Sequence, residues 1–245
     1  MRHDATEKGW RGLRGGARRF GAAHRPLVTC GLPTLSEAES KQLLSRHGVP
    51  VPAETLVATP EEAAAAAAEI GFPVVVKLCG AAIAHKTERG LVKLGLRDPA
   101  AVAAAAAKLL AAARSDDGDV GLLVGAMVTG ARELIAGFVR DDEFGPCVML
   151  GIGGVLAEAV GDVGFRLVPL QPVDAADLID ELSNQALLGP VRGEPAVDRA
   201  ALAEILLGLA AVGDGDERIR SIDLNPLIVS DGIPVAVDAL VEVDR

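Results

Sequence analysis

The pattern of apolar and polar positions predicts helices and strands that alternate along the chain. Helix beginnings carry capping residues: Ser36 with Glu39 forms a capping-box pattern, and Thr59 precedes a proline, two glutamates and an alanine run. Alanine is the best helix former, so the tracts at 63–68 and 103–107 indicate helices that lie on a sheet. The predicted helices span residues 36–48, 59–71, 98–114, 174–188 and 198–211.

Apolar stretches outside these helices predict β-strands. Several neighbouring stretches are separated only by short Gly and Asp turns, such as residues 230–232, which indicates that part of the sheet is antiparallel. The predicted strands span residues 73–78, 91–96, 121–128, 133–139, 147–152, 166–170, 218–229 and 233–241. We therefore expect the α+β fold class, with a boundary between two subdomains near residues 123–127.

Composition narrows the class of protein. Half of the 245 residues are apolar, yet no uncharged apolar run reaches about eighteen residues, so a transmembrane helix is not predicted. The N-terminus has no apolar segment of the length that a secretory signal needs. Three widely spaced cysteines fit a reduced, cytoplasmic chain better than a disulfide scaffold or a zinc site.

Charge is distributed unevenly along the chain. The net charge is −10, but residues 1–26 hold seven basic and two acidic residues, so the remainder is strongly acidic. An acidic body disfavours general binding of nucleic acid. We expect residues 1–34 to form a basic, disordered leader ahead of a domain at 35–245.

The stretch at 71–90 holds the first candidate site. Its apolar strand delivers Lys77 to the rim of the sheet, where a buried cation is costly unless an anion meets it. Phosphate is the expected anion, although an ordinary rim charge explains the lysine equally well. In the following loop, His85 could act as a nucleophile toward phosphorus; a loop histidine bonded to backbone is the plain alternative.

Two later segments also carry candidate chemistry. A glycine-rich segment that includes Gly153 and Gly154 allows the backbone to approach phosphate, although a tight turn explains it equally well. Asp223 and Asn225 share one face of a strand, and Asp238 can return beside them across a turn. Asn and Asp oxygens that leave room for phosphate and water suit magnesium.

Together these segments resemble the ATP-grasp domain of ADP-forming acyl-CoA synthetases, the family of the acetate–CoA ligase β subunit and, more distantly, of the succinyl-CoA ligase β subunit. The likeness runs from about Leu35 to the C-terminus in the family's motif order. It rests on residues 35–41 with 48–51, 71–77, 83–90, 132–146, 151–158 with 165–170, and 223–227 with Asp238. The resemblance implies an ATP-grasp fold, in which two α+β subdomains sandwich the nucleotide.

The resemblance also implies roles for individual residues. Lys77 would bind nucleotide phosphates, His85 would be the family's second phosphohistidine, and Asn225 and Asp238 would bind Mg²⁺ directly. Glu133 and Glu158 are weaker candidates for ribose or indirect contacts, with an ordinary strand-end carboxylate as the alternative. The expected contacts of ATP or ADP are Lys77, Gly125, Ala126, Met127, Glu133, Gly153 and Gly154.

The family's reaction is acyl-CoA + ADP + phosphate ⇌ carboxylate + CoA + ATP. The resemblance therefore implies an acid–CoA ligase (ADP-forming) in which positioning and electrostatics supply most of the catalysis. Because we identify no CoA-binding domain in the sequence, we expect activity only with a CoA-binding α subunit. A hetero-oligomer, α2β2 by analogy with the family, is the expected assembly.

Some positions depart from the family's pattern and keep two alternatives open. The family commonly has an aspartate and paired glycines where this chain has Glu88 and Arg89 followed by Gly90, and the hinge at 125–127 lacks the usual polar residue. One alternative is a degenerate regulatory subunit that senses nucleotide without transferring phosphoryl. The other is an ATP-grasp carboxylate ligase that forms free acyl phosphate and therefore does not need His85.

Overall fold

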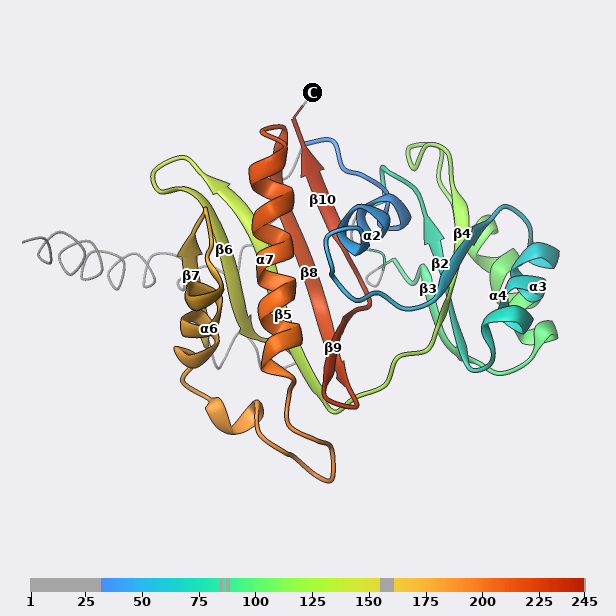
Figure 1. Ribbon diagram of the computed structural model, residues 1–245. Coiled ribbons are helices and arrows are strands. Elements are labelled where there is room, and N and C mark those ends of the chain that lie inside the picture. Colours follow the sequence, from blue (N-terminus) through green and yellow to red (C-terminus); the bar gives the residue numbers. More distant parts are fainter. Residues whose placement is uncertain (1–31, 84–85, 87–88, 155–160, 245) are drawn as a thin grey trace, which may run out of the picture.

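The computed structural model describes residues 32–83, 86, 89–154 and 161–244. These residues form two α+β bodies that lie side by side, each built on an antiparallel sheet (Figure 1). We call them the small body, residues 53–126, and the large body, residues 132–244. The helix α2 (Glu37–Ser45) lies between them (Figure 1). The expected α+β class is thus confirmed.

The small body is a four-stranded sheet with two helices packed on it. Its strands β1 (Glu54–Val57), β2 (Val74–Cys79), β3 (Val92–Leu96) and β4 (Gly121–Ala126) pair in the order β1-β4-β2-β3. The helices α3 (Pro60–Ile70) and α4 (Pro99–Ala111) contribute alanines to its core. Ala67 and Ala106 are both fully buried in the same cluster as Val76 and Leu122, because a methyl side chain lets a helix approach the sheet closely.

Local sequence explains where α3 and α4 begin. Thr59 Oγ1 accepts the N–H of Glu62 at 3.2 Å, while the Glu62 carboxylate accepts the N–H groups of Ala58 and Thr59 at 2.9 and 3.1 Å. Asp98 accepts the N–H of Ala101 at 2.8 Å and so caps α4. Both predicted helix starts are therefore confirmed.

The strand β1 is not predicted from the sequence. Its four residues are half-buried or exposed, so they lack the alternation that marks a half-buried strand. The strand forms because its backbone pairs with β4, from Glu54 opposite Gly125 to Val57 opposite Leu122. Pairing at the edge of the sheet, and not an apolar pattern, defines this element.

The large body is a six-stranded sheet crossed by a long helix. Its strands are β5 (Arg132–Asp141), β6 (Gly145–Ile152), β7 (Val163–Leu167), β8 (Ile219–Ser230), β9 (Ile233–Ala236) and β10 (Leu240–Val243). They pair in the order β10-β8-β5-β6-β7, and β9 also pairs with β8. Helix α7 (Arg199–Gly215) crosses the sheet and α6 (Pro172–Asp180) lies beside β7; the short helix η1 (Gln185–Leu187) joins them (Figure 1).

Two strand predictions need correction. The predicted strand at 233–241 is divided into β9 and β10, because the chain turns between them and Asp238 Oδ1 accepts the N–H of Ala239 at 3.0 Å. The predicted strand at 166–170 lies three residues earlier, as β7, because pairing with β6 begins at Val163 and ends at Leu167.

The predicted helix at 174–188 also needs correction. It ends at Asp180 because the Gln185 side chain turns back and donates to the carbonyl oxygens of Ile179 and Leu182, both at 2.8 Å. These bonds satisfy carbonyl groups that a continuing helix would otherwise use. The remaining turn forms the separate helix η1.

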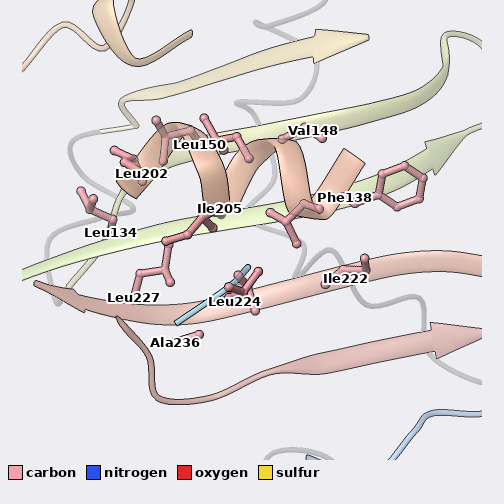
Figure 2. Close-up of a cluster of buried hydrophobic side chains, with 14 of the residues drawn as sticks. Leu134, Phe138, Val148, Leu150, Leu202, Ile205, Ile222, Leu224, Leu227 and Ala236 are labelled. Atoms are coloured by element: carbon pink, nitrogen blue, oxygen red, sulfur yellow. The ribbon is translucent and has the colours of Figure 1, made fainter. Parts of the chain in front are cut away.

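One buried cluster joins α7 to the sheet of the large body. Figure 2 shows Leu202 and Ile205 of α7 among side chains of the strands, including Leu150 and Leu224. Gly213 brings α7 close to β5: a Cβ atom at this position would lie only 2.2 Å from Cε2 of the buried Phe138. The absence of a side chain at Gly213 therefore sets the distance between helix and sheet.

The helix α2 packs on the large body. Leu44 is fully buried in that body's core, while Glu37 and Lys41 are buried polar residues of the same helix. Residues ahead of α2 run along β10. The Leu35 N–H donates to the Val241 carbonyl at 2.9 Å, and Thr34 forms an isolated antiparallel β-bridge with Glu242. The start of α2 is thereby fixed beside the large sheet.

A short connection in the chain links the hydrophobic core of the small body to that of the large body. The last core residue on β4 is Val124 and the first on β5 is Leu134. The expected boundary at 123–127 therefore overlaps the end of β4, and residues 127–131 form the connection. None of the helices that the structure describes is both long and apolar enough to cross a membrane.

Candidate functional site

Lys77 lies on β2 and reaches from the small body to the large one. The strand pairs with β3 and β4 on its two sides, and the lysine is 8% exposed. Its Nζ donates to Glu37 Oε1 at 2.6 Å and to the Val237 carbonyl at 2.7 Å. The lysine thus lies within β2 and not at the rim of the sheet as expected, because the strand continues in register with β4 to Cys79, and its ammonium group meets the segment between β9 and β10.

Glu37 gathers three lysines. Its Oε1 lies 2.8 Å from Lys41 Nζ and 2.6 Å from Lys77 Nζ, and its Oε2 lies 2.7 Å from Lys86 Nζ. Lys41 also pairs with Glu54 Oε2 at 2.9 Å. We call Glu37, Lys41, Glu54, Lys77 and Lys86 the lysine cluster. All except Glu54 are buried, so these ion pairs are largely shielded from water.

The charges of the cluster reinforce one another. Burial raises the pKa of Glu37, but the charges of Lys77, Lys41 and Lys86 outweigh it, and the pKa lies well below its ordinary value. Burial lowers the pKa of Lys86, whereas Asp238 and Glu37 raise it, with a net rise. The pKa of Lys41 rises in the same way, because Glu37 and Glu54 outweigh burial. These groups are therefore charged at neutral pH.

Asp238 connects the lysine cluster to the predicted magnesium residues. Its Oδ1 lies 3.3 Å from Lys86 Nζ. It stands between β9 and β10, which both pair with β8, and the neighbouring Val237 N–H donates to the Pro226 carbonyl at 3.3 Å. Asn225 and Asp238 therefore lie on adjacent segments.

The carboxylates of Asp223, Asp238 and Glu242 give the region around β8 and β10 a negative charge that suits a bound divalent cation. Burial raises the pKa of Asp223 to about 7, and the carboxylates of Asp238 and Glu242 add to the rise. In the described part of the chain, no three His, Cys, Asp or Glu side chains are arranged to hold a metal by themselves. Magnesium usually takes one or two protein carboxylates together with phosphate oxygens and water, so Asn225 and Asp238 suit magnesium that arrives with a nucleotide.

The predicted adenine hinge lies at the end of β4. The N–H groups of Ala126 and Met127 donate to the carbonyl oxygens of Ala53 and Pro73 at 2.9 and 3.1 Å. An adenine ring at this hinge would therefore need backbone partners other than these two donors. Gly125 lies just before them, opposite Val75 of β2.

The glycine-rich segment is packed against β5. The Gly153 N–H donates to the Glu133 carbonyl at 2.8 Å, and a Cβ at Gly153 would lie 3.1 Å from the backbone of Glu133 and Leu134. Gly154 has φ +88°, a conformation that favours glycine. The structure thus brings Glu133, Gly153 and Gly154 together, and close backbone packing accounts for the first glycine.

Arg89, which departs from the family pattern, is anchored on the small body. Its Nη1 and Nη2 donate to the two oxygens of Asp117 at 2.6 and 2.8 Å, and Asp117 also accepts the Arg114 N–H at 2.8 Å. Hydrogen bonds from Arg89 lower the pKa of Asp117 to about 2. The chain just before β3 is thereby tied to the segment that follows α4.

Other candidates fall outside the described residues. They are His85, Glu88 and Glu158. Lys86 stands directly after His85 and is described, so the neighbour of the candidate nucleophile lies beside Asp238 and Glu37.

Four residues of the lysine cluster are not among the site residues predicted from the sequence. Glu37 and Lys41 are four residues apart on α2, a spacing that is typical of exposed helix pairs. Glu54 belongs to β1, the strand that the sequence does not predict. Lys86 stands in the motif with His85, and this adjacency is the one signal that points toward the cluster.

Comparison with known proteins identifies the family. A family model of the ATP-grasp domain matches residues 28–243. The chain is 35% identical over 221 residues to subunit beta of an ADP-forming acetate–CoA ligase (I) of Pyrococcus furiosus, a match that covers 89% of this chain and 92% of that one. A more distant relative, 28% identical over 216 residues, is subunit beta of the ADP-forming succinate–CoA ligase of Natronomonas pharaonis, with 86% and 55% covered.

Solved structures of acetyl-coenzyme A synthetase 1 from Ca. Korarchaeum cryptofilum share the fold. The complex with coenzyme A, Ca-AMPCP and HgCl⁺ has a TM-score of 0.80 and 34% identity, and the match covers 95% of this chain and 99% of that one. A complex with coenzyme A and Mg-AMPPCP, whose phosphohistidine segment points towards the nucleotide-binding site, has a TM-score of 0.75, 37% identity and coverage of 86% and 93%. The fold expected from the resemblance is confirmed, and the chain belongs to the ATP-grasp domain family.

Proposed function

We propose that this chain is the nucleotide-binding subunit of an ADP-forming acyl-CoA synthetase and transfers phosphoryl between His85 and ADP. The observation that carries the proposal is the meeting of Lys77, Lys86 and Asp238 where the two bodies face each other. Two ammonium groups beside a candidate magnesium ligand suit the phosphates of a nucleotide, because charge-assisted hydrogen bonds to phosphate are strong.

Each residue has a role in this proposal. Lys77 binds the nucleotide phosphates, and Glu133, Gly153, Gly154 and the hinge at 125–127 surround the rest of the nucleotide. Asn225 and Asp238 hold Mg²⁺, which when bound neutralises charge on the phosphate oxygens. The imidazole of His85 forms a bond to phosphorus as the bond between phosphorus and the ADP oxygen breaks, and the reverse step yields ATP. Positioning supplies most of the catalysis.

The similar proteins support this proposal and suggest its partner. The Pyrococcus furiosus relative is named as a beta subunit, and this chain spans 92% of it. We therefore propose that a CoA-binding α subunit completes the reaction in a hetero-oligomer, α2β2 by analogy. Cys79 and Cys147 are both free thiols, which fits the cytoplasmic location that we propose.

Phosphoryl labelling tests the proposal. The purified chain is incubated with Mg²⁺ and γ-labelled ATP, with and without a candidate α subunit, beside the variants His85→Ala and His47→Ala. His47 is a matched control, because it lies just after α2 and its Nδ1 contacts the Leu43 carbonyl at 3.1 Å, away from the lysine cluster. The expected result is acid-labile, base-stable label on the wild type and on His47→Ala, and none on His85→Ala.

The other outcomes select among the alternatives. Nucleotide binding without label, even with a competent partner, contradicts the histidine relay and favours a regulatory subunit. Full turnover by His85→Ala favours a carboxylate ligase that forms free acyl phosphate, since such an enzyme does not need the histidine.

A further inference from the structure

We infer that Glu37 is a positioning residue that holds the ammonium groups of Lys77 and Lys86 together as one two-lysine site for phosphate. The inference rests on the proposed function, because it takes Lys77 to contact nucleotide phosphates. Glu37 acts through the two lysines and does not touch the nucleotide itself.

The geometry of one carboxylate sets the spacing of the two cations. Lys77 lies 2.6 Å from Oε1 and Lys86 lies 2.7 Å from Oε2, so each lysine takes a different oxygen of the same planar group. The lysines come from different segments, β2 and the loop that follows it. Two buried like charges that contact the same carboxylate group would repel strongly without the negative charge of that group. Glu37 supplies that charge.

Within the described part of the chain, each of the two lysines keeps at least one N–H for a ligand. An ammonium group has three N–H bonds. Lys77 directs two of them to Glu37 and to the Val237 carbonyl, whereas Lys86 donates one hydrogen bond to Asp238 and forms an ion pair with Glu37 Oε2. Among the contacts of the described residues, each lysine therefore has at least one N–H available to a phosphate oxygen without loss of the contacts that hold it.

Glu37 is itself held rigidly. It is the first residue of α2, whose start is fixed by the capping box in which the Ser36 N–H donates to Glu39 at 2.9 Å. Lys41, one turn further along the helix, contacts Glu37 at 2.8 Å and is in turn fixed by Glu54 at 2.9 Å. Lys77 and Lys86 thus contact residues 237 and 238, whereas Lys41, held by Glu54, contacts the Glu37 carboxylate from its own helix.

Loss of the Glu37 charge is expected to weaken nucleotide binding. Glu37→Gln keeps the size of the side chain but leaves three buried lysines with one carboxylate fewer. Removal of a negative charge would by itself strengthen the electrostatic attraction of the site for phosphate. Weaker binding by Glu37→Gln would therefore mean that the lysines are no longer correctly positioned.

A double-mutant cycle isolates this effect. The dissociation constant of Mg-AMPPCP is measured by calorimetry for the wild type, Lys77→Met, Glu37→Gln and the double variant, with thermal unfolding of each. Each single change is expected to weaken binding by about tenfold or more, and the double variant to be no weaker than about the worse single variant, because both act on one group. Glu181→Gln is the matched control, since it removes a carboxylate that pairs with Arg166 of β7 at 2.8 Å, outside the lysine cluster. It is expected to change the constant less than about threefold, by the same factor with and without Lys77→Met.

The outcomes separate the inference from the proposed function. If Lys77→Met binds as the wild type does, the proposed nucleotide site is wrong. If Lys77→Met weakens binding while Glu37→Gln does not, or if the two effects multiply, only the role of Glu37 is overturned. Should Glu37→Gln fail to fold, Glu37→Asp takes its place in the cycle: it keeps the charge but withdraws it by one methylene, and the same lack of additivity with Lys77→Met is expected.

Discussion

Gly213 provides the sharpest test of how the large body is packed. Gly213→Ala adds one methyl group to α7, and helix propensity alone would favour alanine over glycine by about 1 kcal/mol. In the structure, however, the new Cβ would lie 2.2, 2.3 and 2.5 Å from Cε2, Cζ and Cδ2 of Phe138. Because ordinary carbon–carbon contacts are about 3.5–4.0 Å, the ring would have to move by about 1.3 Å or the helix would have to lift.

Neither movement is easy. Phe138 is fully buried on β5, and the Arg140 guanidinium lies over its ring, 5.6 Å from the centroid. Overpacking of this kind costs about 3 kcal/mol, so after the gain in propensity we expect the free energy of unfolding to fall by about 2 kcal/mol. For a chain of this length the unfolding midpoint should then fall by about 4–8 °C.

Denaturant and thermal unfolding measure this change. Gly215→Ala is the matched control in the same helix, because a Cβ there meets no atom within 4 Å, and it should be neutral or slightly stabilising. Adding Phe138→Leu to Gly213→Ala should recover part of the loss. A Gly213→Ala protein as stable as the wild type would refute the close contact between α7 and β5.

Two further predictions concern the candidate site. Mg²⁺ is expected to increase the affinity for AMPPCP, and Asp238→Asn should reduce this increase by about tenfold because it removes one charged magnesium ligand. Asp231→Asn, in the neighbouring hairpin, should leave the increase unchanged. Titrations with and without EDTA measure it, and an unchanged increase in Asp238→Asn would exclude Asp238 as a ligand. The pKa of Glu37 is lowered from its ordinary value of 4.5, so its contribution to stability is complete above about pH 4.5 and is lost as the pH falls toward the folded-state value. Denaturant unfolding between about pH 6 and about pH 3 should therefore show a steeper loss for the wild type than for Glu37→Gln, and parallel curves would contradict the buried ion pairs.

Local interactions explain which elements could be predicted from the sequence. The starts of α3 and α4 follow from Thr59 and Asp98, whose side chains bond to backbone N–H groups within three residues. Such contacts do not depend on the rest of the fold. By contrast, β1 has no apolar alternation, and its existence depends on β4, which lies more than sixty residues later.

The residues of the candidate site also differ in whether the sequence can predict them. The strand that carries Lys77 and the segments that carry Asn225 and Asp238 can be recognised from residue type and spacing, because a charged group within an apolar strand is costly without a partner. The partner itself is not in the pattern: Glu37 lies forty residues before Lys77, on a helix whose Glu37–Lys41 spacing looks like an exposed pair.

The sequence by itself therefore determined the family, the succession of helices and strands and most of the residue types that carry the chemistry, because these depend on side chains that are near one another in the chain. Only the tertiary structure decided that the Glu37 carboxylate on α2 holds Lys77 and Lys86 from two other segments, that Lys86 lies between Glu37 and Asp238, and that Gly213 sets the distance of α7 from β5. These features are long-range: burial removes charges and atoms from water, and which partner then satisfies them is settled by the packing of distant segments.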